Sequence, residues 1–324
     1  MIMSKTPFRL SFVGGGTDFP DFYRKEGGGV ISTTINKYVY VGVHPSFNGK
    51  IRLQYSVFEE VENVEDIQNT RIRECMKKTE VDGGIELHFL SDIPTKVGLG
   101  GSSSFTVGLL NALYAYKGKI ARPETLAKEA CEVEINALRE PIGKQDQYIS
   151  AYGGFKYIQF NRDDSVLLNH LILNCELRGE LEKRLLLFYT GITRDASSVL
   201  TDQKKNIKKE REYNSLKKLN ELTMEVRKYL GKEDISRFGE MLHEGWKLKK
   251  SLSKKISNSE IDKYYEKALN LGAKGGKIAG AGGGGFLLLY CEPEKQENLR
   301  RGLNDIKETP FRFTFEGSNI IYVE

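Results

Sequence analysis

The sequence predicts an α+β protein of two domains, and three observations lead to that prediction. The chain has 324 residues, enough for about two domains of ordinary size. Its 39% hydrophobic and 29% charged residues are an ordinary globular mixture. Strand and helix patterns alternate without the strict strand-helix-strand order of a parallel sheet. We place the boundary in the polar stretch 176–183, which gives an N-terminal domain over 1–180 and a C-terminal domain over 181–324.

The first half begins with strands. Residues 8–13 alternate between apolar and polar side chains and predict a strand that runs into the Gly-Gly-Gly-Thr-Asp turn at 14–18. Further elements are expected in this order: strands at 38–43 and 51–57, a polar helix at 66–78 and a strand at 85–90. Asn48-Gly49 predicts a hairpin between the strands on either side of it.

Two helices complete the first half. One begins in the serine run at Ser102, continues to Tyr116 and is stopped by Gly118. The other has Pro123 in its first turn, where a missing N–H does no harm, and runs to about Leu138.

The second half begins with an apolar strand at 185–189 and continues with two or three charged helices. One of these helices carries a single apolar stripe formed by Leu216, Leu219, Leu222, Val226 and Leu230. The remaining expected elements are a helix ending near 271–272, a strand at 285–290, a helix at 293–303 and a closing hairpin at 312–324.

Composition excludes several classes of protein. The longest apolar run, at 286–291, is far shorter than the ~20 residues of a membrane-spanning helix, and no signal sequence is visible. The four cysteines are widely spaced, which indicates reduced thiols, and we expect a soluble, cytoplasmic protein. The four histidines are scattered and show no HExxH pattern, so the sequence does not support a zinc site.

The net charge of +5 does not indicate a nucleic-acid partner. Between Asp202 and Lys255 there are 16 lysine and arginine residues against 9 aspartate and glutamate residues. A Lys-rich helical segment of this kind is most often a solvated face, and no nucleic-acid-binding motif accompanies it.

Glycine is frequent in this chain, and its clustering points to candidate functional loops. The chain has 33 glycines, and 20 of them fall in seven clusters, where backbone must turn sharply or approach a ligand closely. The GxGxxG formed by Gly280, Gly282 and Gly285 leads into a strand instead of a helix, which argues against a dinucleotide site and against an oxidoreductase.

Residues 93–104 form the sharpest local motif. They join a strand to a helix through glycines and end in hydroxyls at the helix N-terminus, where unpaired N–H groups and the helix dipole can hold phosphate. The alternative is a serine N-cap on an ordinary loop. A Walker A loop is excluded because no Gly-Lys pair is followed by Ser or Thr.

Three carboxylates are candidates for chemistry. Glu134 falls on a largely apolar helix stripe, where a charge is costly unless a cation or hydrogen bonds meet it, and pairing with Arg139 is the structural alternative. Asp146 follows 12 residues later, beyond a Pro/Gly break, and could instead cap a helix. Asp18 could simply be a turn residue.

Taken together and in this order, the motifs resemble the GHMP kinases, the superfamily of galactokinase, homoserine kinase, mevalonate kinase and phosphomevalonate kinase. The resemblance covers essentially the whole chain. Residues 7–18, 100–113 and 143–147 look most like the bacterial D-glycero-D-manno-heptose 7-phosphate kinases, although L-fucokinases share the Gly-Gly-Gly-Thr-Asp variant.

The resemblance implies a fold and an activity. The N-terminal domain would be like ribosomal protein S5 domain 2, the C-terminal domain would be ferredoxin-like, and the site would lie between them. The activity would be ATP- and Mg²⁺-dependent phosphorylation of the anomeric hydroxyl of heptose 7-phosphate, giving the 1,7-bisphosphate for surface polysaccharide. An L-fucokinase-like sugar kinase and a non-catalytic sugar and ATP sensor on the same fold are the alternatives.

The resemblance also implies roles for residues. Asp146 would be the catalytic aspartate and Arg9 the basic residue beside it, while Ser102 and Glu134 would hold Mg²⁺. The loop that binds ATP would comprise Pro94, Gly98, Leu99, Gly100, Gly101, Ser102, Ser103 and Ser104. The substrate would meet Gly15, Gly16, Thr17, Asp18, Asp146, Gly282 and Gly283. Arg194 is one candidate cation for the sugar phosphate, alongside the Lys-rich helices.

Two departures from the family pattern matter. Gly15-Gly16 replaces the Glu-His pair of galactokinases, which makes galactose doubtful as the substrate. Ser103 replaces the alanine that usually follows the serine pair, so which hydroxyl meets Mg²⁺ is left open.

Overall fold

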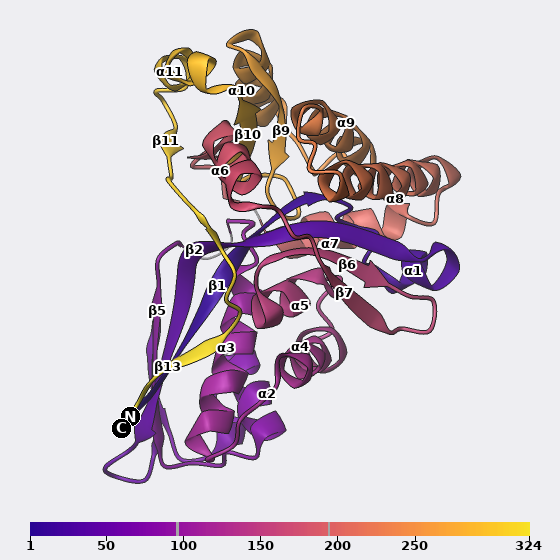
Figure 1. Ribbon diagram of the computed structural model, residues 1–324. Coiled ribbons are helices and arrows are strands. Elements are labelled where there is room, and N and C mark those ends of the chain that lie inside the picture. The colour runs from indigo at the N-terminus through magenta and orange to yellow at the C-terminus, as the bar shows by residue number, and fades with distance from the viewer. Residues whose placement is uncertain (95–96, 194) are drawn as a thin grey trace.

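The computed structural model describes residues 1–94, 97–193 and 195–324 (Figure 1). Its strands are β1 (Ile2–Val13), β2 (Gly28–Pro45), β3 (Ile51–Gln54), β4 (Phe58–Val61), β5 (Ile85–Ser91), β6 (Phe155–Phe160), β7 (Val166–His170), β8 (Leu185–Tyr189), β9 (Ala273–Ile278), β10 (Phe286–Cys291), β11 (Lys307–Glu308), β12 (Phe313–Thr314) and β13 (Asn319–Val323). Its helices are α1 (Pro20–Glu26), α2 (Thr70–Thr79), α3 (Gly101–Tyr116), α4 (Pro123–Cys131), α5 (Gln145–Tyr152), α6 (Cys175–Arg184), α7 (Ala196–Asn206), α8 (Glu210–Gly231), α9 (Phe238–Ser251), α10 (Ser259–Asn270) and α11 (Pro293–Gly302).

The described strands form two sheets. The larger has nine strands and runs β13-β1-β2-β5-β3-β4, with β12 and β6 also paired to β2 and β7 paired to β6. The smaller has four strands in the order β11-β8-β10-β9. The mixture of helices and strands agrees with the predicted α+β class.

The long antiparallel pair β1 and β2 is the backbone of the first sheet, and α2, α3, α4 and α5 lie on one side of it (Figure 1). Helix α3 packs directly on β1 because Gly108 faces Thr6, where a Cβ would come within 2.7 Å of the threonine hydroxyl. The second sheet is covered by α9 and α10 on β9, with α8 beside α9.

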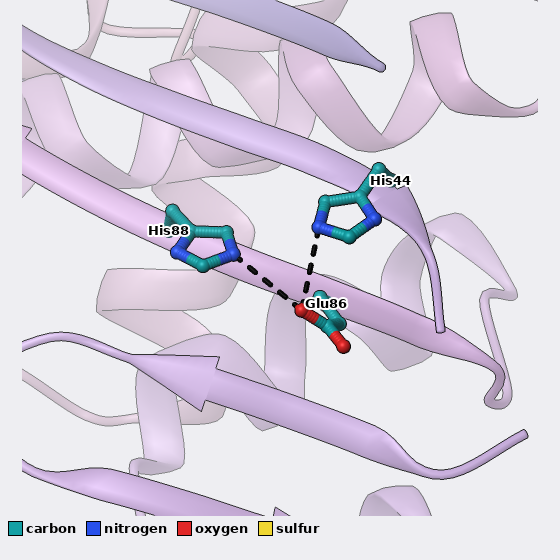
Figure 2. Close-up of side chains that lie close together, drawn as sticks. All are labelled: His44, Glu86 and His88. Atoms are coloured by element: carbon teal, nitrogen blue, oxygen red, sulfur yellow. Dashed lines mark ion pairs between the residues drawn. The ribbon is translucent and has the colours of Figure 1, made fainter. Parts of the chain in front are cut away.

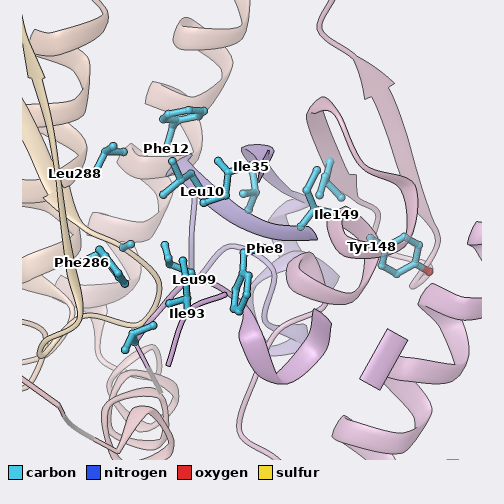
Figure 3. Packing of buried hydrophobic residues seen from close by; sticks show 14 of the residues in the cluster. Phe8, Leu10, Phe12, Ile35, Ile93, Leu99, Tyr148, Ile149, Phe286 and Leu288 are labelled. Atoms are coloured by element: carbon cyan, nitrogen blue, oxygen red, sulfur yellow. The ribbon is translucent and has the colours of Figure 1, made fainter. Parts of the chain in front are cut away.

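One continuous apolar core links the two sheets. Phe8 and Leu10 of β1 belong to it together with Phe286 of β10 (Figure 3). So do Ile93, which precedes the glycine loop at 98–101, and Leu99 within that loop. Each of these side chains is at most 3% exposed. The glycine loop is therefore held from both sides by packed side chains.

The elements expected at 85–90, 185–189, 285–290 and 293–303 are confirmed within one or two residues. The prediction of a hairpin across Asn48-Gly49 is wrong, because β2 and β3 on either side of it do not pair with each other. Strand β5 pairs with β2, while β3 pairs in parallel with β5 and antiparallel with β4. A local turn motif cannot reveal that a later strand is inserted beside β2.

The closing hairpin is also wrong. β12 pairs with β2 and β13 pairs with β1, so the last strands return to the first sheet instead of pairing with each other. The first strand of the second sheet, β8, begins at Leu185, close to the predicted domain boundary at 180. Strands β12 and β13, at 313–323, nevertheless belong to the first sheet, so the boundary at 180 stays a prediction. No helix in the described ranges is long and apolar enough to cross a membrane.

Candidate active site

A pocket is lined by residues from both halves of the chain. Its first wall comprises β1, the turn after it, the glycine loop before α3 and the start of α5. Its second wall comprises the start of α7, Lys249 of α9 and Gly280-Ala281 after β9. The pocket therefore lies between the two sheets, where the family resemblance implies the site.

Arg9 and Asp146 form a two-point ion pair on the pocket wall. Arg9 Nε and Nη2 donate to Asp146 Oδ1 and Oδ2 at 2.7 and 2.5 Å, and Arg9 Nη1 donates to the Gly98 carbonyl at 2.6 Å. The Arg9 side chain is 4% exposed and that of Asp146 is 22% exposed, so the guanidinium is fixed while the carboxylate faces the pocket. Asp146 does not cap α5, because the cap position is Lys144.

The glycine loop opens onto the N-terminus of α3. This helix begins at Gly101, behind Gly100 in the left-handed conformation (φ 77°), and no side chain caps it. Its first N–H groups therefore have neither an intrahelical partner nor a serine cap, and Ser102 and Ser103 of its first turn line the pocket. Such an end suits a phosphate chain.

The glycine loop also touches the loop after β9. A Cβ on Gly98 (φ 83°) would lie 2.5 Å from the Ala279 carbonyl, and a Cβ on Gly280 (φ 69°) would collide with Gly98. Glycine at both positions lets the two backbones meet. Gly282 and Gly283 lie behind this contact, where Gly283 N donates to the Ile256 carbonyl at 2.7 Å.

Glu134 is fully buried in a π-helical turn, Glu132–Ala137, which continues α4. Its carboxylate accepts hydrogen bonds from three side chains: Ser103 Oγ at 2.8 Å, Thr106 Oγ1 at 2.8 Å and Gln147 Nε2. The nearby cation is Arg71, with Nε 3.5 Å from Oε1, and not Arg139 as the sequence suggested. Hydrogen bonds and one cation together explain how a charge is accommodated there.

The serines of the loop have different environments. Ser102 is exposed at the pocket wall, whereas Ser103 is buried and turned toward Glu134. The serine that replaces the family alanine is therefore the one in contact with the carboxylate.

Asp18 is a buried carboxylate at the pocket wall. Its oxygens accept from the backbone N–H groups of Gly16 at 2.9 Å and Gln145 at 3.3 Å. Burial raises the pKa of Asp18, and the nearby Asp146 charge raises it further, while the two backbone donors and Lys249 oppose the rise. Gly143 is required beside it, because a Cβ at 143 would collide with Asp18 Oδ2.

Lys249 brings a buried ammonium to the same wall from α9. The residue is 5% exposed, and Nζ donates to the Gly15 carbonyl at 3.2 Å. Burial lowers its pKa to about 8, although the Asp18 and Asp146 charges oppose the fall. Arg9 and Arg71, the other basic side chains on the described wall, are already paired with carboxylates.

Sequence reasoning named the Lys-rich helices as a candidate for the sugar phosphate but did not single out Lys249, although a pattern could have found it. The buried face of α9 carries Leu242, Gly245 and Trp246, and the same helical spacing continues to Lys249. A lysine on the apolar stripe of a helix is unusual enough to mark a candidate.

Gln145 was missed as well. It lines the pocket, and its side-chain oxygen is buried without a hydrogen-bond partner among the described residues. Gln203 lies against Gly16, and neither of its two buried side-chain polar atoms has a hydrogen-bond partner among the described residues.

The structure places the predicted residues in two groups. Those on the pocket wall are Arg9, Gly16, Asp18, Pro94, Gly98, Gly100, Gly101, Ser102, Ser103 and Asp146. Those outside the wall are Gly15, Thr17, Leu99, Ser104, Glu134, Gly282 and Gly283. Arg194 lies outside the described residues, although its neighbours Asp195, Ala196 and Ser197 line the pocket.

Some residues of the second group hold the backbone. Thr17 Oγ1 donates to the carbonyls of Gly14 and Gly29 at 2.8 and 2.9 Å. Ser104 Oγ donates to the Pro7 carbonyl at 2.9 Å. These side chains shape the two loops from behind, and their predicted ligand contacts stay predictions.

Comparison with known proteins finds two family domains and similar proteins. Residues 69–154 match the GHMP kinases N terminal domain, and residues 226–307 match the GHMP kinases C terminal domain. A D-glycero-alpha-D-manno-heptose 7-phosphate kinase from Campylobacter jejuni is 31% identical over 98% of this chain and 97% of its own length.

Two solved structures share the fold. A putative sugar kinase from Campylobacter jejuni has a TM-score of 0.80 and 29% identity, covering 98% of this chain and 97% of its own. A D-glycero-D-manno-heptose 1-phosphate kinase from Bacteroides thetaiotaomicron has a TM-score of 0.82 and 24% identity, covering both chains completely.

Proposed function

Because this chain belongs to the GHMP kinases, we propose that its substrate is a heptose 7-phosphate, whose anomeric hydroxyl receives the γ-phosphoryl group of ATP. The product would be the 1,7-bisphosphate. The observation that supports this most is the Arg9–Asp146 pair on a pocket wall, in a chain similar over nearly its whole length to a heptose 7-phosphate kinase. We expect the protein to act in the cytoplasm, where the predicted reduced thiols would persist.

Asp146 would receive or orient the proton of the acceptor hydroxyl. Both of its oxygens accept from Arg9, and each keeps a second acceptor direction toward the pocket. The two-point pair fixes the carboxylate, so little reorganisation is needed when the acceptor binds. The Arg9 guanidinium also offsets negative charge on the phosphoryl group as it moves.

ATP would be held by the unit over 1–180. The open N–H groups at the start of α3 and the flexible glycines before it can wrap the phosphates without side-chain interference. Gly98, held against the loop after β9, would set the depth to which the phosphates enter.

Mg²⁺ would be held by Ser102 and Glu134. A carboxylate and a hydroxyl are hard oxygen donors of the kind this ion prefers. Glu134 is fully buried outside the pocket wall and both of its oxygens accept hydrogen bonds, so it would have to exchange some of those bonds for the ion. Ser103 now donates to Glu134, but a hydroxyl hydrogen rotates freely and could turn away when a cation approaches. When bound, the ion would neutralise charge on the ATP phosphates.

The sugar phosphate would meet Lys249 of the unit over 181–324. Among the described residues its ammonium makes one hydrogen bond, to Gly15, which leaves two donors for a phosphate oxygen. Asp18 on the pocket wall would take one sugar hydroxyl. The Gln145 oxygen, which has no partner among the described residues, would take another, because an unpaired buried acceptor costs about 1–3 kcal/mol and a ligand hydroxyl removes that cost.

The test is a substrate panel with Mg·ATP, measured by ADP release. The acceptors are heptose 7-phosphate, free heptose, mannose, fucose and galactose. We expect heptose 7-phosphate to give the highest kcat/KM, with product phosphorylated at C1. Equal efficiency on free heptose would refute the sugar-phosphate assignment, and higher efficiency on fucose would favour the fucokinase alternative. Absence of ADP release with every acceptor would favour the sensor.

A further inference from the structure

Two of the four histidines of the chain converge on one carboxylate, away from the pocket (Figure 2). His44 lies near the end of β2, and Glu86 and His88 lie two residues apart on β5, so their side chains share one face of the first sheet. The strand register sets His44 opposite Glu86 and His88 opposite Gly42. One ligand atom from each of the three side chains lies within 4.8 Å of the others.

The hydrogen bonding of His44 leaves a lone pair directed at an acceptor. His44 Nδ1 lies 2.9 Å from the Pro45 carbonyl, which only accepts, so Nδ1 carries the hydrogen. In the neutral ring Nε2 then has a lone pair, 3.3 Å from Glu86 Oε2. Two acceptor atoms at this distance repel unless a proton or a metal ion lies between them.

Hydrogen bonds do not join the whole cluster, whose His44 and His88 side chains are 35% and 41% exposed. His88 Nε2 points to the same Glu86 oxygen from 3.7 Å, so one proton cannot bridge both rings. The rings are parallel, with centroids 5.6 Å apart and planes within 7°, so one ring must turn about its Cβ–Cγ bond before both in-plane Nε2 lone pairs reach the same ion. A single divalent cation would satisfy all three ligand atoms at once.

The surroundings orient the donors as they do around metal ligands. Arg52 Nη1 donates to Glu86 Oε1 at 2.6 Å, which leaves Oε2 for the rings, and the Arg52 charge is shared with Glu60 at 3.3 Å. The Pro45 carbonyl orients His44 in the same way, because it accepts from Nδ1 and leaves Nε2 for the ion. Partners of this kind fix the tautomer and angle of ligating side chains.

We propose that His44 Nε2, His88 Nε2 and Glu86 Oε2 bind a transition-metal dication of the Zn²⁺ class. Two nitrogens and one carboxylate oxygen are a common zinc donor set, and bonds of about 2.0–2.2 Å at tetrahedral angles place ligand atoms about 3.3–3.5 Å apart. The observed separations of 3.3 and 3.7 Å from Glu86 Oε2 are close to that spacing.

The bound ion would join β2 to β5 and act on stability. The cluster lies beside the start of β1, where Ile2 pairs with Val43, and Arg9 is roughly 23 Å further along that strand at about 3.3 Å per residue. The site is therefore independent of the kinase pocket and of the proposed substrate.

The experiment titrates Zn²⁺ into the full chain after chelator treatment, by calorimetry and by thermal melting. The parent protein of this experiment carries Cys175→Ser, which removes the exposed thiol among the four cysteines as a competing ligand. The double variant carries His44→Asn and His88→Asn in addition. His170→Asn is the matched control, because His170 contacts Lys156 and lies outside the cluster.

We expect one equivalent of Zn²⁺ to bind the parent and the His170→Asn control. Its affinity should fall at least 100-fold in the double variant, and its binding should raise the melting temperature of the parent by several degrees. Bound Co²⁺ should give visible bands typical of tetrahedral coordination. Glu86→Gln, with metal-free melting as the folding check, should weaken binding without unfolding the chain. Binding that is absent, or equal in the parent and the double variant, would overturn the proposal.

Discussion

Replacing Lys249 with methionine should make the protein more stable and a poorer kinase. Lys249 is buried, and its pKa falls from an ordinary value of about 10.4 to about 8. At about 1.36 kcal/mol per pKa unit, this difference corresponds to about 3 kcal/mol of destabilisation while the side chain is charged. Methionine removes that charge and keeps a similar length.

One opposing contribution reduces the gain. The substitution removes the hydrogen bond to the Gly15 carbonyl, which leaves a buried acceptor unpaired at about 1 kcal/mol. The net gain at pH 7 is therefore about 2 kcal/mol. With an unfolding entropy of roughly 2.1 cal/mol/K per residue, that gain raises the melting temperature by about 3 °C.

The pH dependence identifies the charge as the cause. Between pH 8 and about pH 10.4 the unfolded chain keeps the Lys249 proton while the folded chain releases it, so the stability of the parent rises with pH across that window. The advantage of the methionine variant should be complete below pH 8 and nearly lost at pH 10.

The assay is thermal or urea unfolding of parent and variant at pH 7 and pH 10, with kcat/KM measured in parallel at pH 7. We expect kcat/KM for heptose 7-phosphate to fall at least tenfold and for free heptose to change little. A variant that is no more stable than the parent at pH 7, or whose advantage is the same at pH 10, would refute the reasoning about the buried charge.

Three further predictions, which use four substitutions, test the site. Asp146→Asn should lower kcat by about 10²- to 10⁴-fold with little change in substrate affinity, because the proton acceptor is lost; a folded and fully active variant would remove Asp146 from the mechanism. Ser102→Ala should weaken the apparent Mg·ATP affinity more than Ser103→Ala if the exposed hydroxyl meets the ion, and steady-state kinetics at varied Mg²⁺ would show the reverse order if Ser103 does. Gly98→Ala should lower the melting temperature and raise the KM for ATP, because a left-handed non-glycine residue costs about 1–2 kcal/mol and its Cβ meets the Ala279 carbonyl; wild-type values for both would show that the loop contact is not required.

Local motifs predicted the parts of the site that lie on short, regular segments. The Arg9 strand, the glycine loop and the start of α3 were all visible because their spacing and residue types are local properties of the chain. The pairing of Arg9 with Asp146 followed from the family resemblance, and the structure gives it a distance and a direction.

Contacts between distant segments were not predictable in this way. Lys249 reaches the pocket because α9 packs across the second sheet, and β5 is inserted beside β2 after a turn that looked like a hairpin. His44 and His88 are 44 residues apart, so the sequence showed no metal pattern, yet neighbouring strands bring them together. Each of these depends on strand order or helix packing, which no short motif encodes.

The pairing of β13 with β1 affects how the protein is made. A ribosome extends the chain at about 5–20 residues per second, so β1 leaves the exit tunnel many seconds before β13 is available. During that time one edge of the first strand has no partner and can pair with other extended chains. We therefore expect the nascent protein to depend on chaperones until β13 is made, and a version lacking β13 to aggregate even though its pocket residues are all present.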